Sequence, residues 1–206
     1  RAHGHADART EDAVRILAAT TNRGKIAEIR RILANLPVVV VSPADLNLSL
    51  DVPENGSTFM ENALAKAMAY MQASGLPSLA DDSGLCVEAL GLRPGVLSAR
   101  FAGPLATDRD NYELLLDLMK NVTDRRAFFE CAVALAWDGD TVITATGRCD
   151  GFILTAPRGG GGFGYDPVFL EPRSQKTFAE LDEDAKNSVS HRGRALAALA
   201  REIRNR

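Results

Sequence analysis

The stretch "ATTNRGK" (19–25) joins an apolar run to a helical pattern, with two hydroxyl side chains, an amide and a glycine before Lys25. Free backbone N–H groups and the helix dipole attract phosphate at a helix N-terminus, and Lys25 adds a positive charge there. The spacing differs from that of a P-loop, G-x-x-x-x-G-K-[ST]. The stretch predicts either a phosphate-binding turn or a plain strand-to-helix connection with a solvent-facing lysine.

Two adjacent carboxylates, Asp81 and Asp82, follow the short apolar run "SLA" and precede a serine and a glycine. Neighbouring acids repel each other, and a turn would need only one aspartate. Glu54, before the turn signal Asn55-Gly56, is a loop acid that gains interest only beside a metal ion. The second aspartate of the pair therefore calls for a cause other than turn formation.

The segment from Thr58 to Ser74 has a helical pattern that is almost uniformly apolar, and its charged residues are Glu61 and Lys66. A helix of this composition should be largely buried, and a buried lysine is costly unless it is paired or bound to an anion. Lys66 shares a helical face with Asn62, four residues earlier. Lys66 is therefore either a ligand-binding cation or a side chain whose amine reaches solvent at the rim.

The segment "RGGGGFGYDP" (158–167) contains five glycines in ten residues and has no Lys or Ser/Thr where a Walker loop requires them. Glycines let a backbone approach a flat ligand closely, and Phe163 and Tyr165 offer stacking faces. Asp166 could hydrogen-bond the edge of a base. The alternative is a flexible loop without a ligand.

In "KNSVSHRGRAL" (186–196), Ser188 or Ser190 can cap a C-terminal helix, which places His191 and Arg192 near its first turn. Cations at a helix N-terminus oppose the macrodipole. An anionic or carbonyl-bearing ligand would resolve that conflict. The alternative is a pair of surface side chains with no role.

The order of the apolar runs predicts an α/β protein. "VRILAAT" (14–20) is typical of a buried strand, the segment 22–36 has apolar residues at helical spacing, and "VVVV" (38–41) predicts a second strand. A β-α-β opening favours a parallel pair of strands. A short strand is then expected to end at the aspartate pair.

Helix and hairpin signals continue along the second half of the chain. Thr107 begins another helical pattern, with Asp110 in the position that completes a capping box. The runs 127–137 and 141–153 flank "DGD", which predicts a β-hairpin. A last helix is predicted over residues 192–206. We expect a mixed, twisted sheet with helices packed on it.

The composition is that of an ordinary globular protein, with 46% hydrophobic and 25% charged residues among 206. We expect residues 1–13 to form a mobile N-terminal extension and residues 14–206 to form one domain. The net charge of −3 and the lack of a Lys/Arg run argue against binding of nucleic acid. No apolar run approaches the roughly 20 residues that span a bilayer, and no signal peptide is visible.

The three cysteines, Cys86, Cys131 and Cys149, include no C-x-x-C pair. Each lies in an apolar or strand-like stretch, so we expect reduced, partly buried thiols in a cytoplasmic protein. No His or Lys stands near them to lower a thiol pKa, which disfavours cysteine catalysis.

Six segments occur in an order that resembles one known family: "TTNRGK", "PENGSTFMENALAKA", "ADDSGL", "GVLSARFAG", "GGFGYDPVF" and "SHRGRAL". Together they resemble the Ham1/RdgB-like family, the inosine/xanthosine triphosphate pyrophosphatases, over residues 14–200. The departures are minor: Thr21 stands where many members have glycine, and one position of the four-glycine run is often polar.

The resemblance implies an α/β fold with a long, mixed, twisted sheet flanked by helices, and an active-site cleft between two lobes. It implies a homodimer that uses Mg²⁺ to hydrolyse ITP, dITP and XTP to the monophosphate and pyrophosphate. This reaction removes deaminated purines from the nucleotide pool.

The resemblance also implies the site residues. Glu54 and Asp82 bind metal, and Asp82 is the proton acceptor. The substrate-binding residues are Thr20, Thr21, Asn22, Arg23, Gly24, Lys25, Lys66, Ser83, Phe163, Gly164, Tyr165, Asp166, Lys186, His191 and Arg192.

The residue types agree with this chemistry. Attack on a phosphate linkage requires a positioned water and charge neutralisation, and Mg²⁺ binds carboxylate and phosphate oxygens while it keeps several waters. Adjacent carboxylates would then hold a cation and a water together. The cation offsets their repulsion, and one acid takes the proton of the water.

Two other functions fit parts of the sequence. A Maf-like nucleotide pyrophosphatase of related fold would prefer modified pyrimidines or canonical nucleotides, and the segments "GGFGYDP" and "SHRG" argue against it. A non-catalytic nucleotide sensor would keep the lysines and Phe163 without needing Glu54 and Asp82.

Overall fold

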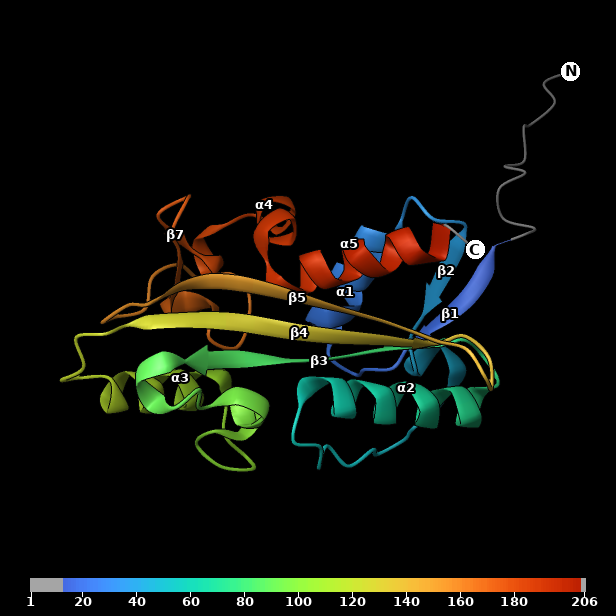
Figure 1. The fold of residues 1–206 in the computed structure, drawn as a ribbon, viewed down its shortest axis with the longest axis horizontal. Helices are drawn as coiled ribbons and strands as arrows, with labels where there is room; N and C mark the ends of the chain where they lie inside the picture. The colour runs from blue at the N-terminus through green and yellow to red at the C-terminus, as the bar shows by residue number, and fades with distance from the viewer. Residues whose placement is uncertain (1–12, 205–206) are drawn as a thin grey trace, which may run out of the picture.

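A computed structural model describes residues 13–204 of the chain (Figure 1). The predicted N-terminal extension therefore lies outside the described residues, apart from Ala13. The strands are β1 (Val14–Ala18), β2 (Val38–Val41), β3 (Ser78–Val87), β4 (Arg126–Ala136), β5 (Val142–Ile153), β6 (Phe169–Glu171) and β7 (Lys176–Thr177). The α-helices are α1 (Arg23–Leu33), α2 (Phe59–Ser74), α3 (Asp108–Leu118), α4 (Glu183–Val189) and α5 (His191–Arg204).

Short 3₁₀ helices connect these elements. They are η1 (Ala44–Leu46), η2 (Glu88–Leu90), η3 (Gly95–Arg100), η4 (Asp166–Val168) and η5 (Phe178–Glu180).

One seven-stranded sheet runs through the described part of the chain in the order β2-β1-β3-β4-β5-β6-β7. β1 is parallel to β2 and β3, and the remaining neighbours are antiparallel. Helices α2 and α3 lie on one side of the long strands, and α1, α4 and α5 lie on the other (Figure 1). This arrangement confirms the predicted α/β class with a mixed, twisted sheet.

The long central strands β3, β4 and β5 connect two ends of the molecule that have separate cores. At the β1 end, Ile16 and Leu196 belong to the core between the sheet and helices α1 and α5, and Ala63 belongs to the core under α2. At the other end, Phe169 and Phe178 are fully buried in a third core. The two ends correspond to the two lobes that the resemblance implies.

Most of the elements predicted from local sequence signals are present in the structure. The predicted capping boxes start α2 at Thr58 and α3 at Thr107, and Gly75 ends α2 with φ of 69°. The hairpin of β4 and β5 turns at the predicted "DGD". The strand predicted to end at the aspartates is instead longer, since β3 stays paired with β4 from Ser78–Ala136 to Val87–Ala127.

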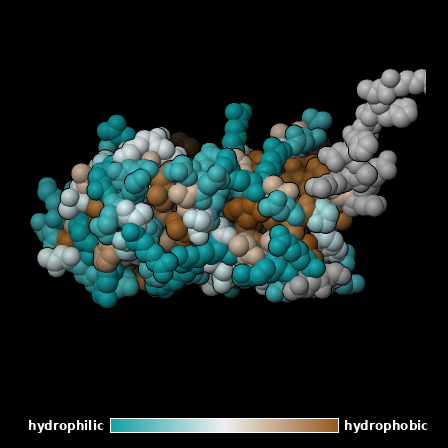
Figure 2. Space-filling view, turned by 90° about the horizontal axis from the view of Figure 1, so that it is seen from above, coloured by the Kyte–Doolittle hydropathy of each residue, from teal (hydrophilic) through white to brown (hydrophobic). Residues whose placement is uncertain are grey.

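One face of the molecule is largely polar (Figure 2), and the cysteine thiols are buried. Seen from above, much of the surface is hydrophilic, and hydrophobic side chains gather mainly in the half that carries β1 and β2 (Figure 2). Within residues 13–204, no helix has the length and apolar character needed to cross a membrane. The three cysteines are buried and unpaired, whereas the sequence predicted partial burial, and burial raises the pKa of the Cys131 thiol to about 12.

Candidate active site

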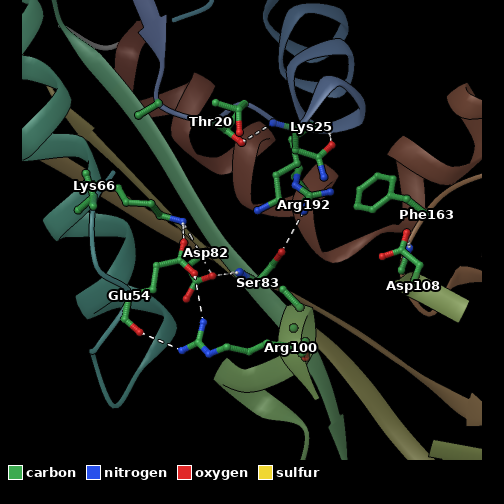
Figure 3. A pocket seen from close by; sticks show the side chains of 18 of the residues that line it. Thr20, Lys25, Glu54, Lys66, Asp82, Ser83, Arg100, Asp108, Phe163 and Arg192 are labelled. Carbon is green, nitrogen blue, oxygen red and sulfur yellow. Dashed lines mark hydrogen bonds and ion pairs between the residues drawn. The ribbon is translucent and has the colours of Figure 1, made fainter. Parts of the chain in front are cut away.

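The main cavity opens along the edge of β3, beyond the point where β1 ends (Figure 3). β1 pairs with β3 at Leu17–Ser78 and Ala18–Leu79 and then stops, so it leaves the β3 edge uncovered from Asp81 onward. The cavity has a volume of about 540 Å³. In α/β sheets, ligands bind beyond the carboxyl ends of parallel strands, and this cavity lies at such a place.

The cavity brings together residues from every segment that the sequence singled out. The predicted site residues that line it are Thr20, Thr21, Asn22, Lys25, Glu54, Lys66, Asp82, Ser83, Phe163, Gly164, Tyr165, Asp166, Lys186, His191 and Arg192. Gly24 lines a smaller cavity of about 190 Å³, which Phe163 also lines. Arg23 is exposed at the start of α1 and belongs to neither lining.

Helix α2 fixes the orientation of Asp82, the predicted proton acceptor. The Asn62 amide Nδ2 donates to Asp82 Oδ2 over 2.8 Å, and Asn62 Oδ1 accepts from the backbone N–H of Gly56. One turn along the helix, Lys66 Nζ lies 4.0 Å from Asp82 Oδ1. The i, i+4 spacing therefore places an amide and an ammonium on one carboxylate.

Glu54 lies beside Asp82 because two cations hold it. Lys66 Nζ contacts Glu54 Oε1 at 2.5 Å, and Arg100 Nη2 donates to the Glu54 backbone carbonyl at 3.1 Å. The side chain of Lys66 is only 12% exposed. Lys66 is therefore a mostly buried, paired cation near both predicted metal-binding carboxylates, and not a solvent-reaching lysine.

Asp81 points away from Asp82, because successive residues of a strand face opposite sides of the sheet. Asp81 Oδ2 contacts Lys25 Nζ and Arg192 Nε, each at 3.0 Å, and the residue is 2% exposed. The expectation that the two adjacent acids hold one cation is therefore wrong for Asp81. Asp81 neutralises two cations of the site, and Glu54 is the carboxylate that accompanies Asp82.

The turn between β1 and α1 directs the N-terminus of α1 to the cavity. Asn22 caps α1, and its Oδ1 accepts from the Lys25 backbone N–H at 3.1 Å. Thr20 Oγ1 accepts from the Asn22 backbone N–H at 3.2 Å. The helix N-terminus and the Lys25 ammonium thus face one cavity, which favours an anionic ligand over a plain connection.

The glycine-rich loop forms the opposite wall of the cavity and is held by hydrogen bonds. Asp166 Oδ2 accepts from the Phe163 backbone N–H at 2.9 Å and from Lys186 Nζ at 2.7 Å. The Gly164 backbone N–H donates to Asp108 Oδ2 at 2.7 Å. These contacts present the Phe163 ring to the cavity, with Lys186 Nζ 4.5 Å from its centroid.

Two residues of this loop, Tyr165 and Asp166, are buried and bound to other parts of the protein, although the sequence suggested contacts with a ligand. Tyr165 is 3% exposed, and its hydroxyl donates to the Ser98 carbonyl at 2.8 Å, so its ring is not a free stacking face. Asp166 is equally buried, and its Oδ2 is engaged by the loop and by Lys186. The loop thus leaves Phe163 as the aromatic ring available to a base.

Helix α5 brings His191 to the cavity. Gly147 of β5 makes the approach possible, since a Cβ there would come within 2.1 Å of the His191 carbonyl oxygen. Ser190 Oγ accepts from the Gly193 backbone N–H at 3.1 Å, which confirms Ser190 as a cap of this helix. The His191 ring stacks on Phe129, with centroids 4.5 Å apart. Burial and then nearby cations lower the His191 pKa well below its usual value, so its imidazole is neutral.

Glu28 of α1 links Lys186 and Arg192 at the Phe163 end of the cavity, and sequence reasoning missed it. Arg192 donates through Nη1 to Glu28 Oε2 and through Nη2 to Ser83 Oγ, over 2.5 and 2.9 Å. Lys186 Nζ lies 3.1 Å from Glu28 Oε1. Its position three residues after Lys25, on the same helical face, was the available signal.

Asp82 has the electrostatic setting of a base. Burial raises its pKa above the usual value, Lys66 and the Asn62 hydrogen bond oppose that rise, and the nearby Glu54 charge adds to it. A carboxylate with a raised pKa is a stronger proton acceptor than one with its usual pKa. The geometry therefore suits Asp82 to take a proton from a water in the cavity.

The charges that line the cavity balance before any ligand arrives. The carboxylates are Asp51, Glu54, Asp82, Asp108 and Asp166, and the cations are Lys25, Lys66, Arg100, Lys186 and Arg192. A highly anionic ligand would therefore gain from an accompanying cation. Glu54 and Asp82 offer the hard oxygen ligands that Mg²⁺ prefers.

Glu54 and Asp82 fit a metal ion that takes only part of its coordination shell from the protein. Within residues 13–204, no group of three or more His, Cys, Asp or Glu side chains could hold a metal ion. Mg²⁺ usually takes one or two carboxylates and completes its shell with waters and substrate phosphates. Glu54 and Asp82 would supply the protein's share, and a phosphate chain would supply more.

Comparison with known proteins finds relatives along nearly the whole chain. The family model described as "Ham1 family" matches residues 16–202. The dITP/XTP pyrophosphatase of Syntrophobacter fumaroxidans is 50% identical over 91% of this chain and 81% of its own length. That of Geobacter sulfurreducens is 49% identical over 90% of this chain and 94% of its own length.

Solved structures show the same fold. A HAM1 protein from Coxiella burnetii superposes with a TM-score of 0.86 and 40% identity, over 94% of this chain and all (100%) of the other. A nucleoside-triphosphatase / dITP/XTP pyrophosphatase from Mycobacterium abscessus has a TM-score of 0.72 and 44% identity, over 90% of this chain and 98% of the other.

Proposed function

This chain belongs to the Ham1 family, and we infer that it is an enzyme, a dITP/XTP pyrophosphatase. We propose further that ITP is a substrate and that the reaction depends on Mg²⁺. The observation that carries the proposal is one cavity with two functional ends. Asp82 and Glu54 lie at one end, and Phe163, Lys186 and Arg192 lie at the other.

The base would bind at the Phe163 end. The Phe163 ring can stack on any base, so it contributes affinity without discrimination. Arg192 uses three of its five N–H groups on protein partners, which leaves two donors for the 6-oxo group of hypoxanthine or xanthine. The 6-amino group of adenine would place donors against donors, so ATP should be a poor substrate.

The phosphate chain would extend from the base toward Lys25 and Lys66. A water attacks the α-phosphorus, its oxygen forms the new P–O bond, and Asp82 accepts its proton. The bond between the α-phosphorus and the bridging oxygen breaks, and pyrophosphate leaves with that electron pair. When bound by Glu54 and Asp82, Mg²⁺ supplies charge neutralisation for the phosphate oxygens.

A panel of nucleotides tests the proposal. With Mg²⁺ present, ITP, dITP and XTP should release pyrophosphate and the monophosphate, at rates far above those for ATP and for pyrimidine triphosphates. Release of orthophosphate with a diphosphate product would refute the proposed cleavage point. Preference for a modified pyrimidine would favour the Maf-like alternative, and tight binding without turnover would favour a sensor.

We also propose a cytoplasmic homodimer. Buried, unpaired cysteines suit a reducing compartment, which also holds the nucleotide pool. One face of β5 suits a second copy, since Val142, Thr146, Arg148 and Phe152 on it are exposed while the alternate residues are buried or half-buried. An isologous interface requires one self-complementary patch. Light scattering on wild type and on Thr146→Arg tests the proposed dimer. Wild type should be a dimer and Thr146→Arg a monomer. A monomeric wild type would contradict the proposal.

A further inference from the structure

Arg100 differs from the other cations of the main cavity because no carboxylate closely neutralises it. Each of the other four has a carboxylate oxygen within 3.0 Å, in the pairs Lys25–Asp81, Lys66–Glu54, Lys186–Asp166 and Arg192–Asp81. The nearest contact of this kind for Arg100 is 3.9 Å, from Nη1 to Glu54 Oε2. Arg100 therefore carries the least compensated positive charge in the lining.

Arg100 also keeps most of its hydrogen-bonding capacity. A guanidinium has five N–H donors in a planar fork. Nη2 donates to the Glu54 backbone carbonyl at 3.1 Å, and the side chain is 39% exposed, compared with 12% for Lys66. A planar donor group that is partly open to a cavity suits phosphoryl oxygens, which it can bind in a bidentate way.

The backbone that carries Arg100 is fixed against the sheet. Gly84 of β3 admits η3 at close range, because a Cβ there would lie 2.3 Å from the Gly95 carbonyl oxygen. Ser98 Oγ accepts from the Leu85 backbone N–H at 2.9 Å and donates to the Gly95 carbonyl at 2.6 Å. The position of Arg100 is therefore set by β3, the strand that also carries Asp82.

The direction of the side chain places its charge at the reacting end. In Figure 3, Arg100 approaches Glu54 from the side opposite Lys25 and Arg192. A phosphate chain that lies over Asp82 would therefore have Lys25 on one side and Arg100 on the other. Charge that develops on phosphate oxygens during the reaction is stabilised most by donors that are already in place.

We propose that Arg100 is a catalytic residue that donates to the phosphate chain of the substrate beside Asp82 and Glu54. The inference rests on the proposed pyrophosphatase function and adds a residue to its machinery. Water adds to the α-phosphorus, Asp82 takes its proton, and the α-phosphorus–oxygen bond breaks. Arg100 stabilises the negative charge that leaves with pyrophosphate.

The test compares Arg100→Ala, Arg100→Lys and wild type with ITP and saturating Mg²⁺. Loss of a charged donor at a transition state costs about 10²–10³-fold in kcat, so Arg100→Ala should lose activity in that range. Arg100→Lys should recover part of it, because lysine keeps the charge without the fork. Arg109→Ala is the matched control, since Arg109 is an exposed arginine paired with Glu113 and lies outside the cavity lining.

Product inhibition supplies a readout that a purely structural role would not change. Pyrophosphate should inhibit Arg100→Ala at least about tenfold more weakly than wild type, as expected for one lost charged contact. Inhibition by IMP should stay within twofold. The inhibition constants can be measured on the residual activity, and thermal melting checks that each variant is folded.

A different result would overturn the assignment. If pyrophosphate inhibits Arg100→Ala as strongly as it inhibits wild type, the residue makes no contact with the phosphate chain and only holds the Glu54 loop. If wild type does not release pyrophosphate from any nucleotide in the panel, the proposed function fails first. The two failures are therefore distinguishable.

Discussion

The carboxylate of Asp108 accepts a hydrogen bond from the Gly164 backbone N–H, with 2.7 Å between Oδ2 and N. Asp108 is the first residue of α3, and Gly164 follows Phe163 in the glycine-rich loop. The contact therefore ties the loop that carries the Phe163 ring, which we propose stacks on the base, to a helix more than fifty residues earlier in the chain. It offers a way to loosen the loop without touching the reacting end of the cavity.

Asp108→Ala should weaken substrate binding while it leaves the chemical step intact. Loss of a hydrogen bond to a charged acceptor costs about 1.5–3 kcal/mol, which corresponds to roughly a tenfold or greater rise in KM for ITP. The value of kcat should change by less than about threefold. Asp117→Ala, which removes an exposed acid from the same helix, is the control. A fall in kcat at unchanged KM would contradict this role.

Asp82→Asn should inactivate the enzyme and yet stabilise its fold. Loss of a general base alone costs about 10²–10⁴-fold in kcat, and loss of a metal ligand adds to that. Burial, followed by the Glu54 charge, raises the Asp82 pKa in the folded state. A group with a raised folded pKa favours folding below its unfolded pKa and loses that contribution as pH rises through the folded pKa.

At pH 7 the ionised Asp82 is therefore a net cost that asparagine removes. We expect the melting temperature of Asp82→Asn, without metal or nucleotide, to exceed that of wild type by a few degrees at pH 7. About 1 kcal/mol corresponds to about 2–4 °C for a chain of this size. The difference should shrink toward pH 4. A variant with near wild-type turnover would remove Asp82 from the mechanism.

Much of the fold could be predicted because its elements carry strong local signals. The capping boxes at Thr58 and Thr107 and the "DGD" turn each specify a helix start or a hairpin within a few residues. β3 was predicted too short because an Asp-Asp-Ser-Gly run is typical of a turn. Its pairing with β4 overrides that preference, and long-range pairing has no local signature.

The residues of the site could be predicted better than their partners. Lys25, Lys66, Asp82 and Phe163 lie in segments that resemble a known family, and the structure brings them to one cavity. The partners of the site residues in the fold are Asn62, Glu28, Arg100 and Asp108. Helical spacing indicates that Asn62 lies near Lys66 and Glu28 near Lys25. It gives no sign of the contacts that Arg100 and Asp108 make. Arg100 occurs in the recognised segment "GVLSARFAG", yet its approach to Glu54 depends on how η3 packs against β3.

Base selection should depend on Arg192 and not on Phe163. Arg192→Lys keeps a positive charge beside Asp81 and loses the planar fork that can meet a 6-oxo group. We expect this variant to lower kcat/KM for ITP by about 10–100-fold and to change the value for ATP much less, so that the ITP/ATP ratio falls.

Phe163→Ala is the companion variant for the same measurement. Because stacking is similar for both bases, kcat/KM should fall by a similar factor for ITP and ATP, about 5–100-fold. Steady-state kinetics on the two nucleotides decides the matter. An unchanged ITP/ATP ratio in Arg192→Lys would move base reading to another residue.

Asp81→Asn should lower the melting temperature, whereas Asp82→Asn should raise it, although the two residues are neighbours. Burial alone would raise the Asp81 pKa, but Lys25, Arg192 and Lys66 together hold it below its usual value. A group with a lowered folded pKa stabilises the protein above its unfolded pKa, and the contribution disappears as pH falls. Removal of one partner from a buried ion pair costs about 3–5 kcal/mol, so the melting temperature at pH 7 should fall by about 6–20 °C.

The pH dependence separates this effect from a general loss of packing. The deficit of Asp81→Asn should be constant between about pH 5 and pH 8 and should narrow below about pH 4, where the unfolded carboxyl begins to bind protons. Asp150→Asn, which alters an exposed acid on β5, should leave the melting temperature nearly unchanged. If Asp81→Asn were as stable as wild type, Asp81 would not be the residue that neutralises Lys25 and Arg192. Its contacts place it there because a β-strand turns alternate side chains to opposite faces, which gives one acid to the scaffold and the next to the cavity.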